Sequence, residues 1–207
     1  MERLIVHEEP GSLITKAYRI LCTNVLSRHN ERIIEVVGVA ENNNTSLVVA
    51  NLAVAIAQAG KSILLVDCNL HTPKQHELFA LQNSGVTDCI ITGDSYKSYV
   101  QATRQVNLSV LTAGTAVENP VEMLLSGAMQ KVLKESRETY DIVLLDLPSI
   151  AAASDAVALG IHADSVLLVL TNKQDKVEQA KKAKEVFLQA GVPILGCVLD
   201  KVPVKSM

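Results

Sequence analysis

The segment from Ile33 to Ala53 constrains the fold most strongly, because an apolar run, a polar loop and an apolar helix follow one another there. Residues 33–39 predict a buried strand, the loop begins near Gly38, and residues 46–59 predict a helix that ends before Gly60. This order is typical of a phosphate-binding loop, in which backbone N–H groups at a helix N-terminus face an anion. The sequence therefore predicts an anion site at the start of this helix.

The residues of the loop differ from those of a working triphosphate site. A G-x-x-x-x-G-K-[ST] loop uses glycine for tight backbone turns and a lysine that reaches the β- and γ-phosphates. With Ser46 as the hydroxyl residue, Thr45 stands at the lysine position and Asn44 at the preceding glycine. The resulting vestigial phosphate loop is predicted to comprise Asn42, Asn43, Asn44, Thr45, Ser46 and Leu47.

The charge of the chain argues against nucleic acid as a partner. The 207 residues carry a formal net charge of −3, and no long basic run is present. No apolar stretch approaches the roughly 18 residues that span a bilayer, and the N-terminus lacks a signal-peptide pattern. The four cysteines lack metal-ligand spacing and are expected to be buried thiols. Together these features predict a cytoplasmic protein.

Strands and helices are predicted to alternate along the whole chain. Strands are expected at 33–39, 62–67, 107–112, 141–146, 165–170 and 193–199. Helices or shorter helical elements are expected at 13–28, 46–59, 73–79, 85–91, 120–134, 154–160 and 175–190. Continuously apolar strands are typical of a parallel sheet that is buried on both faces. We therefore predict one α/β domain over residues 1–207, three-layered, with a mostly parallel central sheet and an amphipathic N-terminal helix at about 13–28.

Two of the apolar strands are predicted to end in carboxylates, Asp67 and Asp146. Ligands collect at the carboxyl ends of parallel strands, and such carboxylates hold Mg²⁺ in phosphate-transferring enzymes. The alternative is that both aspartates only terminate their strands. The matching pair favours a site at this edge, with Ser46, Asp67 and Asp146 as candidate Mg²⁺ ligands.

Several ordered motifs carry a family resemblance over residues 10 to 203. They include Lys16-Ala-Tyr-Arg-Ile-Leu-Cys-Thr-Asn24, Ile63-Leu-Leu-Val-Asp-Cys-Asn-Leu-His-Thr-Pro73 followed by His76 and Phe79, and Tyr140-Asp-Ile-Val-Leu-Leu-Asp-Leu-Pro148. The chain resembles the bacterial tyrosine kinases (BY-kinases) of capsular and exopolysaccharide synthesis, a branch of the MinD/ParA-like P-loop ATPases. In an active member the resemblance would make Asp67 the catalytic base, would bring ATP or ADP with Mg²⁺ to the site, and would place Asp200 where relatives contact adenine.

The departures from the family pattern fall where this chemistry would take place. The family's P-G-E-G-K-S loop corresponds here to Glu41-Asn-Asn-Asn-Thr-Ser46, and the second aspartate of the next motif is Asn69. Thr45 cannot supply the positive charge of a lysine. We therefore expect no high-affinity nucleotide cofactor and a non-catalytic regulator or scaffold of polysaccharide synthesis. The alternatives are an active ATP-dependent protein tyrosine kinase and, less favoured, a MinD/ParA-like positioning ATPase.

The resemblance also implies partners. The family's ring-forming E-x-x-R-x-x-R motif is reduced here to Arg19, because Lys16 and Cys22 occupy the flanking positions. A homo-oligomer is conceivable, but the family's ring is not expected. The implied partners are a membrane polysaccharide co-polymerase or adaptor, which would recruit the chain to the inner face of the membrane, or an active kinase paralogue. Tyr96 and Tyr99 are expected to be surface residues.

Overall fold

A computed structural model describes residues 4–28, 30–40, 44–150, 155–160, 162–171 and 177–202. Its centre is a seven-stranded sheet with the order β3-β4-β2-β5-β1-β6-β7. The strands are β1 (Ile33–Gly38), β2 (Ile63–Asp67), β3 (Gln101–Ala102), β4 (Leu108–Leu111), β5 (Ile142–Leu147), β6 (Ser165–Thr171) and β7 (Ile194–Asp200). All neighbouring pairs are parallel except β3 with β4. The predicted mostly parallel sheet is confirmed.

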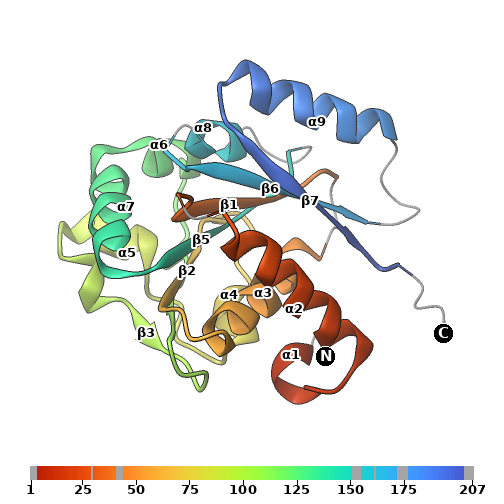
Figure 1. Cartoon of the computed structure of the whole chain (residues 1–207). Helices are drawn as coiled ribbons and strands as arrows, with labels where there is room; N and C mark the ends of the chain where they lie inside the picture. Colours follow the sequence, from red (N-terminus) through yellow and green to blue (C-terminus); the bar gives the residue numbers. More distant parts are fainter. Residues whose placement is uncertain are drawn as a thin grey trace.

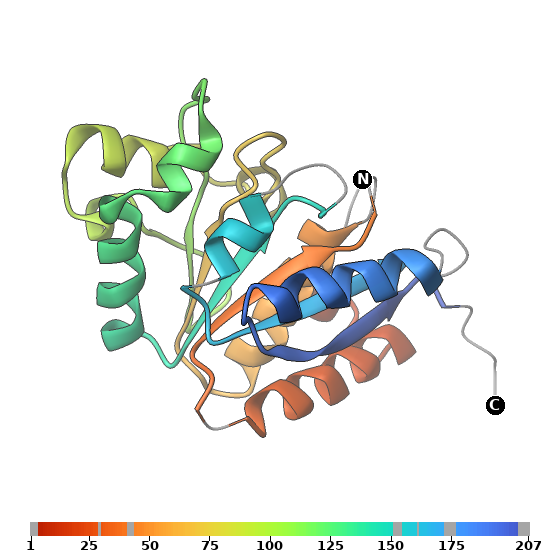
Figure 2. The same cartoon turned by 90° about the horizontal axis from the view of Figure 1, so that it is seen from above.

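Helices cover both faces of this sheet, which confirms the three-layer architecture (Figure 1). One face packs against α1 (Ile5–Glu8), α2 (Leu13–Leu26) and α3 (Thr45–Gln58). The other packs against α5 (Val86–Thr92), α6 (Pro120–Leu125), α7 (Gly127–Thr139), α8 (Asp155–Gly160) and α9 (Val177–Gln189). Figure 2 shows α9 lying along β6 and β7, with α7 toward the other end of the sheet. Two short elements, α4 (Gln75–Leu78) and the 3-10 helix η1 (Tyr96–Ser98), complete the description.

The core is aliphatic and has two halves, because successive side chains of a strand point to opposite faces of the sheet. In β1, Val36 packs on the face that carries α3, whereas Val37 packs on the face that carries α9. Helix α3 lies between the sheet and helices α1 and α2, so most of its residues are buried. This double cover explains why its sequence is apolar on all sides rather than amphipathic.

The structure corrects several expectations about single residues. Helix α2 buries Thr15, Cys22 and Val25, whereas Ile20, expected on the apolar face, is 64% exposed. Tyr96 is buried rather than on the surface, and its hydroxyl lies 3.5 Å from Thr139 Oγ1. Cysteines 22, 68 and 89 are buried free thiols as expected, but Cys197 is exposed. It lies on β7, which is an edge strand and is therefore covered less completely.

The structure also contains elements that the sequence did not predict, namely α1, η1 and the two-residue strand β3. All three are shorter than the windows over which a hydrophobic period can be recognised. Within the described part of the chain, no helix combines the length and the apolar character needed to cross a membrane.

Candidate functional site

Asp67 and Asp146 meet at the carboxyl edge of the sheet. They are paired in the parallel register of β2 and β5, and neither side chain is exposed to solvent. The backbone N–H of Cys68 donates to the carbonyl oxygen of Asp146 over 2.9 Å, which extends the pairing beyond β2. The predicted convergence of the two carboxylates is therefore observed.

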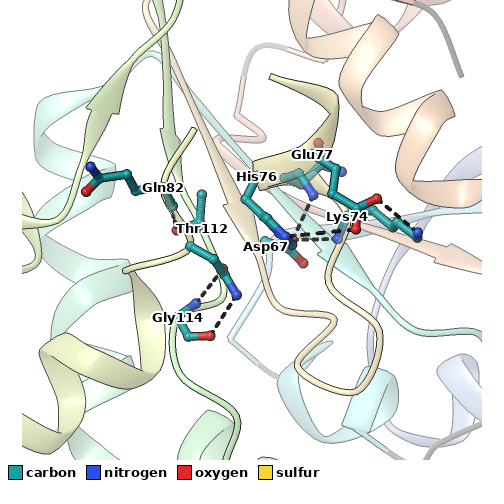
Figure 3. A network of polar contacts seen from close by, with 9 residues as sticks. Asp67, Lys74, His76, Glu77, Gln82, Thr112 and Gly114 are labelled. Atoms are coloured by element: carbon teal, nitrogen blue, oxygen red, sulfur yellow. Dashed lines mark hydrogen bonds and ion pairs between the residues drawn. The ribbon is translucent and has the colours of Figure 1, made fainter. Parts of the chain in front are cut away.

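The carboxylate of Asp67 organises the loop that follows β2. Its Oδ1 accepts from the backbone N–H of Asn69 at 3.2 Å, and its Oδ2 accepts from those of Lys74 and Gln75 at 3.1 and 3.0 Å. Figure 3 shows Asp67 facing the segment that carries Lys74 and Glu77. The ammonium group of Lys74 lies 3.1 Å from a carboxylate oxygen of Glu77, so it is paired at the surface. Both oxygens of Asp67 are thus occupied by backbone donors.

The carboxylate of Asp146 contacts side chains from two other elements. The side-chain amide of Gln75 donates to its Oδ2 over 2.7 Å, and the hydroxyl of Ser46 also hydrogen-bonds to this carboxylate. The same amide nitrogen of Gln75 donates to the carbonyl oxygen of Ser46 over 3.0 Å. The other oxygen, Asp146 Oδ1, is buried and has no hydrogen-bond partner. Asp146 therefore offers one free acceptor next to the start of α3.

Burial is the largest influence on the pKa values of Asp67 and Asp146, and it raises both. It raises the pKa of Asp146 to about 6, although the hydrogen bonds from Gln75 and Ser46 act in the opposite direction. The pKa of Asp67 is raised well above its usual value by burial and by the neighbouring Asp146, against the effect of its three backbone donors. Two carboxylates this close cannot both ionise easily, because each disfavours the charge of the other.

The phosphate-loop residues are described from Asn44 onward, whereas Asn42 and Asn43 lie outside the described residues. Helix α3 begins at Thr45, one residue earlier than predicted, and Asn44 precedes it with φ −78° and no side-chain capping bond. Asn44 therefore does not use the left-handed conformation that glycine would permit. Thr45 is only 6% exposed, and Ser46 and Leu47 are half-buried. The side chain of Asn44 therefore does not occupy the first backbone N–H groups of α3, which are the groups that face the anion in a phosphate loop.

Asp200 lies apart from Asp146 and Asp67. It ends β7, which is separated from β5 by β1 and β6, so three strand spacings give a lateral distance of ~14 Å. There it lines a pocket of about 540 Å³ between α2 and β7, together with Tyr18 and Val48. Asp200 Oδ2 is buried without a hydrogen-bond partner. The pKa of the Tyr18 phenol is raised mainly by the burial of Tyr18 and to a smaller extent by the negative charge of Asp200.

The chemistry of the donor set fits a divalent cation at the Asp146 side of the site. Ser46 and Asp146 offer the oxygen ligands that Mg²⁺ prefers, and Asp146 Oδ1 is an unsatisfied buried acceptor. Among the residues that the structure describes, no group of three His, Cys, Asp or Glu side chains could hold a metal by itself. A cation would therefore need further ligands from a bound phosphate or from water.

The structure shows contacts of two polar residues in the segment after β2 that the sequence did not predict. Asn69, which replaces the second aspartate of the motif, accepts from the backbone N–H and the hydroxyl of Thr72, each at 3.2 Å. It therefore stabilises the turn that follows β2. Gln75 was not a predicted site residue, although it is fully buried between Asp67, Asp146 and Ser46. Only its position between a proline and a short apolar segment is visible in the sequence, and that carries no specific signal.

Comparison with known proteins agrees with this geometry. A family model described as an AAA domain matches residues 37–183. The tyrosine-protein kinase YwqD of Bacillus subtilis (strain 168) is 36% identical over 201 residues, which cover 95% of this chain and 85% of YwqD. The chain belongs to the bacterial tyrosine kinase family. Within this family, CapB of Staphylococcus aureus is 33% identical over 97% of this chain and 90% of its own length.

A solved structure from the same family has the same fold as this chain. The crystal structure of the chimerical protein CapA2B2 superimposes with a TM-score of 0.92 and 31% sequence identity, covering 97% of this chain and 90% of that chain. The predicted family is therefore confirmed. The septum site-determining protein MinD of Pyrococcus horikoshii is 23% identical and superimposes with a TM-score of 0.69 over 81% of this chain and 69% of that chain, which confirms the predicted MinD/ParA-like P-loop fold.

Proposed function

We propose that this chain is a non-catalytic member of the bacterial tyrosine kinase family, acting as a regulator or scaffold in capsular or exopolysaccharide biosynthesis. The observation that carries the proposal is Thr45, which occupies the lysine position and is buried in the first turn of α3. A lysine at this position would reach the β- and γ-phosphates with a full positive charge. Thr45 offers a short neutral side chain with 6% exposure, so the phosphates would lose a charge-assisted contact.

The environment of Asp67 supports the same proposal. A general base needs a carboxylate oxygen within hydrogen-bonding reach of the proton that it accepts. Both oxygens of Asp67 already accept from backbone N–H groups of the segment 69–75, and the side chain is not exposed.

An active ATP-dependent protein tyrosine kinase is the second candidate, and a specific contact favours it. The hydroxyl of Ser46 remains hydrogen-bonded to Asp146, whose Oδ1 is unpaired. Ser46 and Asp146 would then hold Mg²⁺, which would neutralise phosphate charge when bound with ATP. Asp67 would have to exchange a backbone donor for the hydroxyl proton of a substrate tyrosine.

Isothermal titration calorimetry with Mg-ATP and Mg-ADP, together with detection of phosphotyrosine, separates the two candidates. YwqD of Bacillus subtilis, a named tyrosine-protein kinase, serves as the positive control under identical conditions. We expect dissociation constants of about 1 mM or weaker for both nucleotides, which corresponds to about −4 kcal/mol of binding free energy, and no phosphotyrosine. Micromolar affinity accompanied by autophosphorylation would establish the active kinase instead.

The proposed partners are a membrane polysaccharide co-polymerase or adaptor and an active kinase paralogue, with the former recruiting this cytoplasmic chain to the membrane. The state of the ring motif supports a hetero-partner over self-assembly. Lys16 and Arg19 are exposed on α2, whereas Cys22, at the position of the second family arginine, is buried and cannot reach a neighbouring subunit. Size-exclusion chromatography with light scattering, on the chain alone and after mixing with each partner, tests this. A ring of this chain alone would contradict the proposal.

A further inference from the structure

Glu35 places a carboxyl group inside the apolar core, away from the candidate site. It lies on β1, the strand between β5 and β6, and its side chain is not exposed to solvent. Leu145 and Val166 are its partners in these two neighbouring strands. Both carboxyl oxygens of Glu35 are buried without a hydrogen-bond partner. Buried polar atoms are normally paired, so this residue calls for a physical explanation.

The end of α8 leaves room for this carboxyl group. Gly160 is the last residue of α8, and a β-carbon there would lie 2.8 Å from Glu35 Oε2, 3.2 Å from Val192 and 3.4 Å from Phe187. The φ of Gly160 is not in the left-handed region, so glycine is needed here for space and not for its backbone conformation. Helix α8 therefore packs closely on Glu35 because position 160 has no side chain.

Helix α8 is held in place by its neighbours, because it is short. It has six residues, and isolated helices shorter than about 12 residues are marginal in water. It lies between α6 and α9 and contacts both of them as well as β1 (Figure 1). Short peripheral segments open at a lower free energy than the core strands of a sheet. We therefore expect α8 to leave β1 while the sheet stays folded.

The strand and helix that pack beside Glu35 bring no counter-charge to it within the described part of the chain. On β6, Asp164 lies two positions before Val166 and is paired with Arg137. Helix α9 buries Ala183 and Phe187 toward this core. The charged side chains of α9 are exposed instead, namely Glu178, Lys181, Lys182, Lys184 and Glu185.

The remaining titratable groups near α8 offer no partner either. The charged residue of α8 itself, Asp155, stands at the opposite end of the helix from Gly160. His162 follows α8, and its Nε2 lies 3.4 Å from the side-chain nitrogen of Gln130. The pKa of the Cys68 thiol is raised by burial and then by the charges of Asp67, Asp146 and Glu35, but a thiol supplies no positive charge. An ionised Glu35 would therefore be buried without compensation.

We propose that Glu35 is a proton-dependent switch for α8: the neutral carboxyl group allows α8 to pack on β1, and loss of its proton releases α8 from the sheet. Burial of an ionised carboxylate without a donor or a counter-charge costs much more free energy than burial of the neutral acid. Movement of α8 away from β1 would uncover Glu35 Oε2, since Gly160 lies next to this oxygen. Water would then solvate the charge.

The direction of the pH dependence follows from these two states of α8. In the packed state, burial raises the pKa of Glu35 well above its ordinary value of 4.5, whereas the released state exposes the group and restores that value. Between the two pKa values, release of α8 is accompanied by the loss of one proton. The equilibrium constant for release therefore rises about tenfold per pH unit in this range.

Hydrogen exchange of the α8 amides tests the switch, because it measures the opening of α8 without any ligand. In the wild-type chain we expect their protection, corrected for the intrinsic exchange rate, to fall about tenfold per unit from pH 5 upward. Glu35→Gln keeps nearly the same volume but cannot ionise, so its α8 protection should not change with pH. The controls Glu138→Gln, an exposed change on α7, and His162→Gln should keep the wild-type slope. The amides of β5 should stay more protected than those of α8.

A pair of backgrounds tests the contact between Glu35 and Gly160. Gly160→Ala should lower the thermal midpoint of the wild-type chain, because the added β-carbon meets Glu35 Oε2. The loss should be smaller in the Glu35→Val background, where this oxygen is gone. The approach to Val192 and Phe187 is common to both backgrounds and cancels in the comparison. If Glu35→Gln does not fold, Glu35→Val also serves as the variant that cannot ionise.

A pH slope that persists in the variant without an ionisable group at position 35 would overturn the switch. So would equal protection of the α8 and β5 amides in the wild-type chain, because the whole sheet would then open together. Equal effects of Gly160→Ala in both backgrounds would likewise refute it. None of these results depends on nucleotide binding, so the switch and the proposed function are tested separately.

Discussion

Asp67 lies directly opposite Asp146 in the parallel pair of β2 and β5, and both carboxyl groups are fully shielded from solvent. Three backbone donors face Asp67, whereas side chains of Gln75 and Ser46 face Asp146. Two buried acids side by side have a cost in the free energy of folding that depends on pH, since ionisation of either is disfavoured. The candidate site should therefore be visible in the pH dependence of stability.

The first prediction concerns Asp146→Asn. Burial raises the pKa of Asp146 from 3.8 to about 6, so the folded chain binds more protons than the unfolded chain between these values. The free energy of unfolding consequently falls as pH rises through this window, by about 3 kcal/mol for a shift of this size. Asp146→Asn should lose this dependence and gain stability relative to the wild type above pH 6. Urea denaturation at several pH values measures it, and parallel curves for the two proteins would contradict the assignment.

The second prediction concerns Glu35, which lies in β1 with both carboxylate oxygens buried and without hydrogen-bond partners. Burial raises its pKa well above the usual value. Stability is therefore lost as pH rises, because the unfolded chain ionises Glu35 freely. Glu35→Met should stabilise the fold by about 1–3 kcal/mol at pH 8, since no unpaired polar atom remains buried. Thermal unfolding measures the gain, and the exposed change Glu138→Met should produce none.

The third prediction tests the phosphate loop. Thr45→Lys restores the family's lysine, but Asn44 and Asn69 still replace a glycine and an aspartate of the family pattern. We expect no measurable release of ADP from ATP by this variant. Because Thr45 is buried, the lysine should also lower the thermal midpoint compared with the exposed control Thr23→Lys. Turnover by Thr45→Lys alone would mean that a single residue had inactivated the site.

The fourth prediction concerns Asp164, which directly precedes β6 and so lies at the end of the sheet opposite to Asp67 and Asp146. Its Oδ2 accepts from the backbone N–H groups of Arg32 and Ile33, each at 2.8 Å, and Arg137 donates to its Oδ1. Although burial raises the pKa of Asp164, the hydrogen bonds from Ile33, Arg137 and Arg32 lower it below the usual value. The stabilisation of the fold by the ionised Asp164 is fully present above the unfolded pKa near 3.8, and it is lost as pH falls through the lower pKa of the folded chain.

Asp164→Asn should therefore destabilise the chain by about 1–3 kcal/mol at pH 7 and by less in acid. Denaturant titrations at pH 7 and in acid measure the difference. The surface change Asp94→Asn serves as the control, and an equal loss of stability at both pH values would argue against the ionised state of Asp164 as the cause.

The secondary structure was largely predictable because the signals are local. A strand of a parallel sheet that helices cover on both faces is continuously apolar. The residues of β2 and β5 alone were therefore enough to predict these strands. The convergence of Asp67 and Asp146 was predictable as well, since the carboxyl ends of parallel strands share one edge. The face of α2 was not predictable, because Cys22 is buried by residues of α3 and of the sheet that are distant in sequence, whereas Ile20 is 64% exposed.

The sequence by itself determined the family, the alternating α/β order and the presence of Thr45 where the family pattern has a lysine, because each depends on residue identity at fixed spacing. Only the tertiary structure decided which polar groups satisfy the two carboxylates. Gln75 and its acceptor Asp146 are 71 positions apart along the chain. They meet because α4 folds back against α3. Asp200 is separated from Asp146 because β1 and β6 lie between β7 and β5. Hydrogen-bond partners and strand order are properties of the packed chain, and no local pattern of residues encodes them.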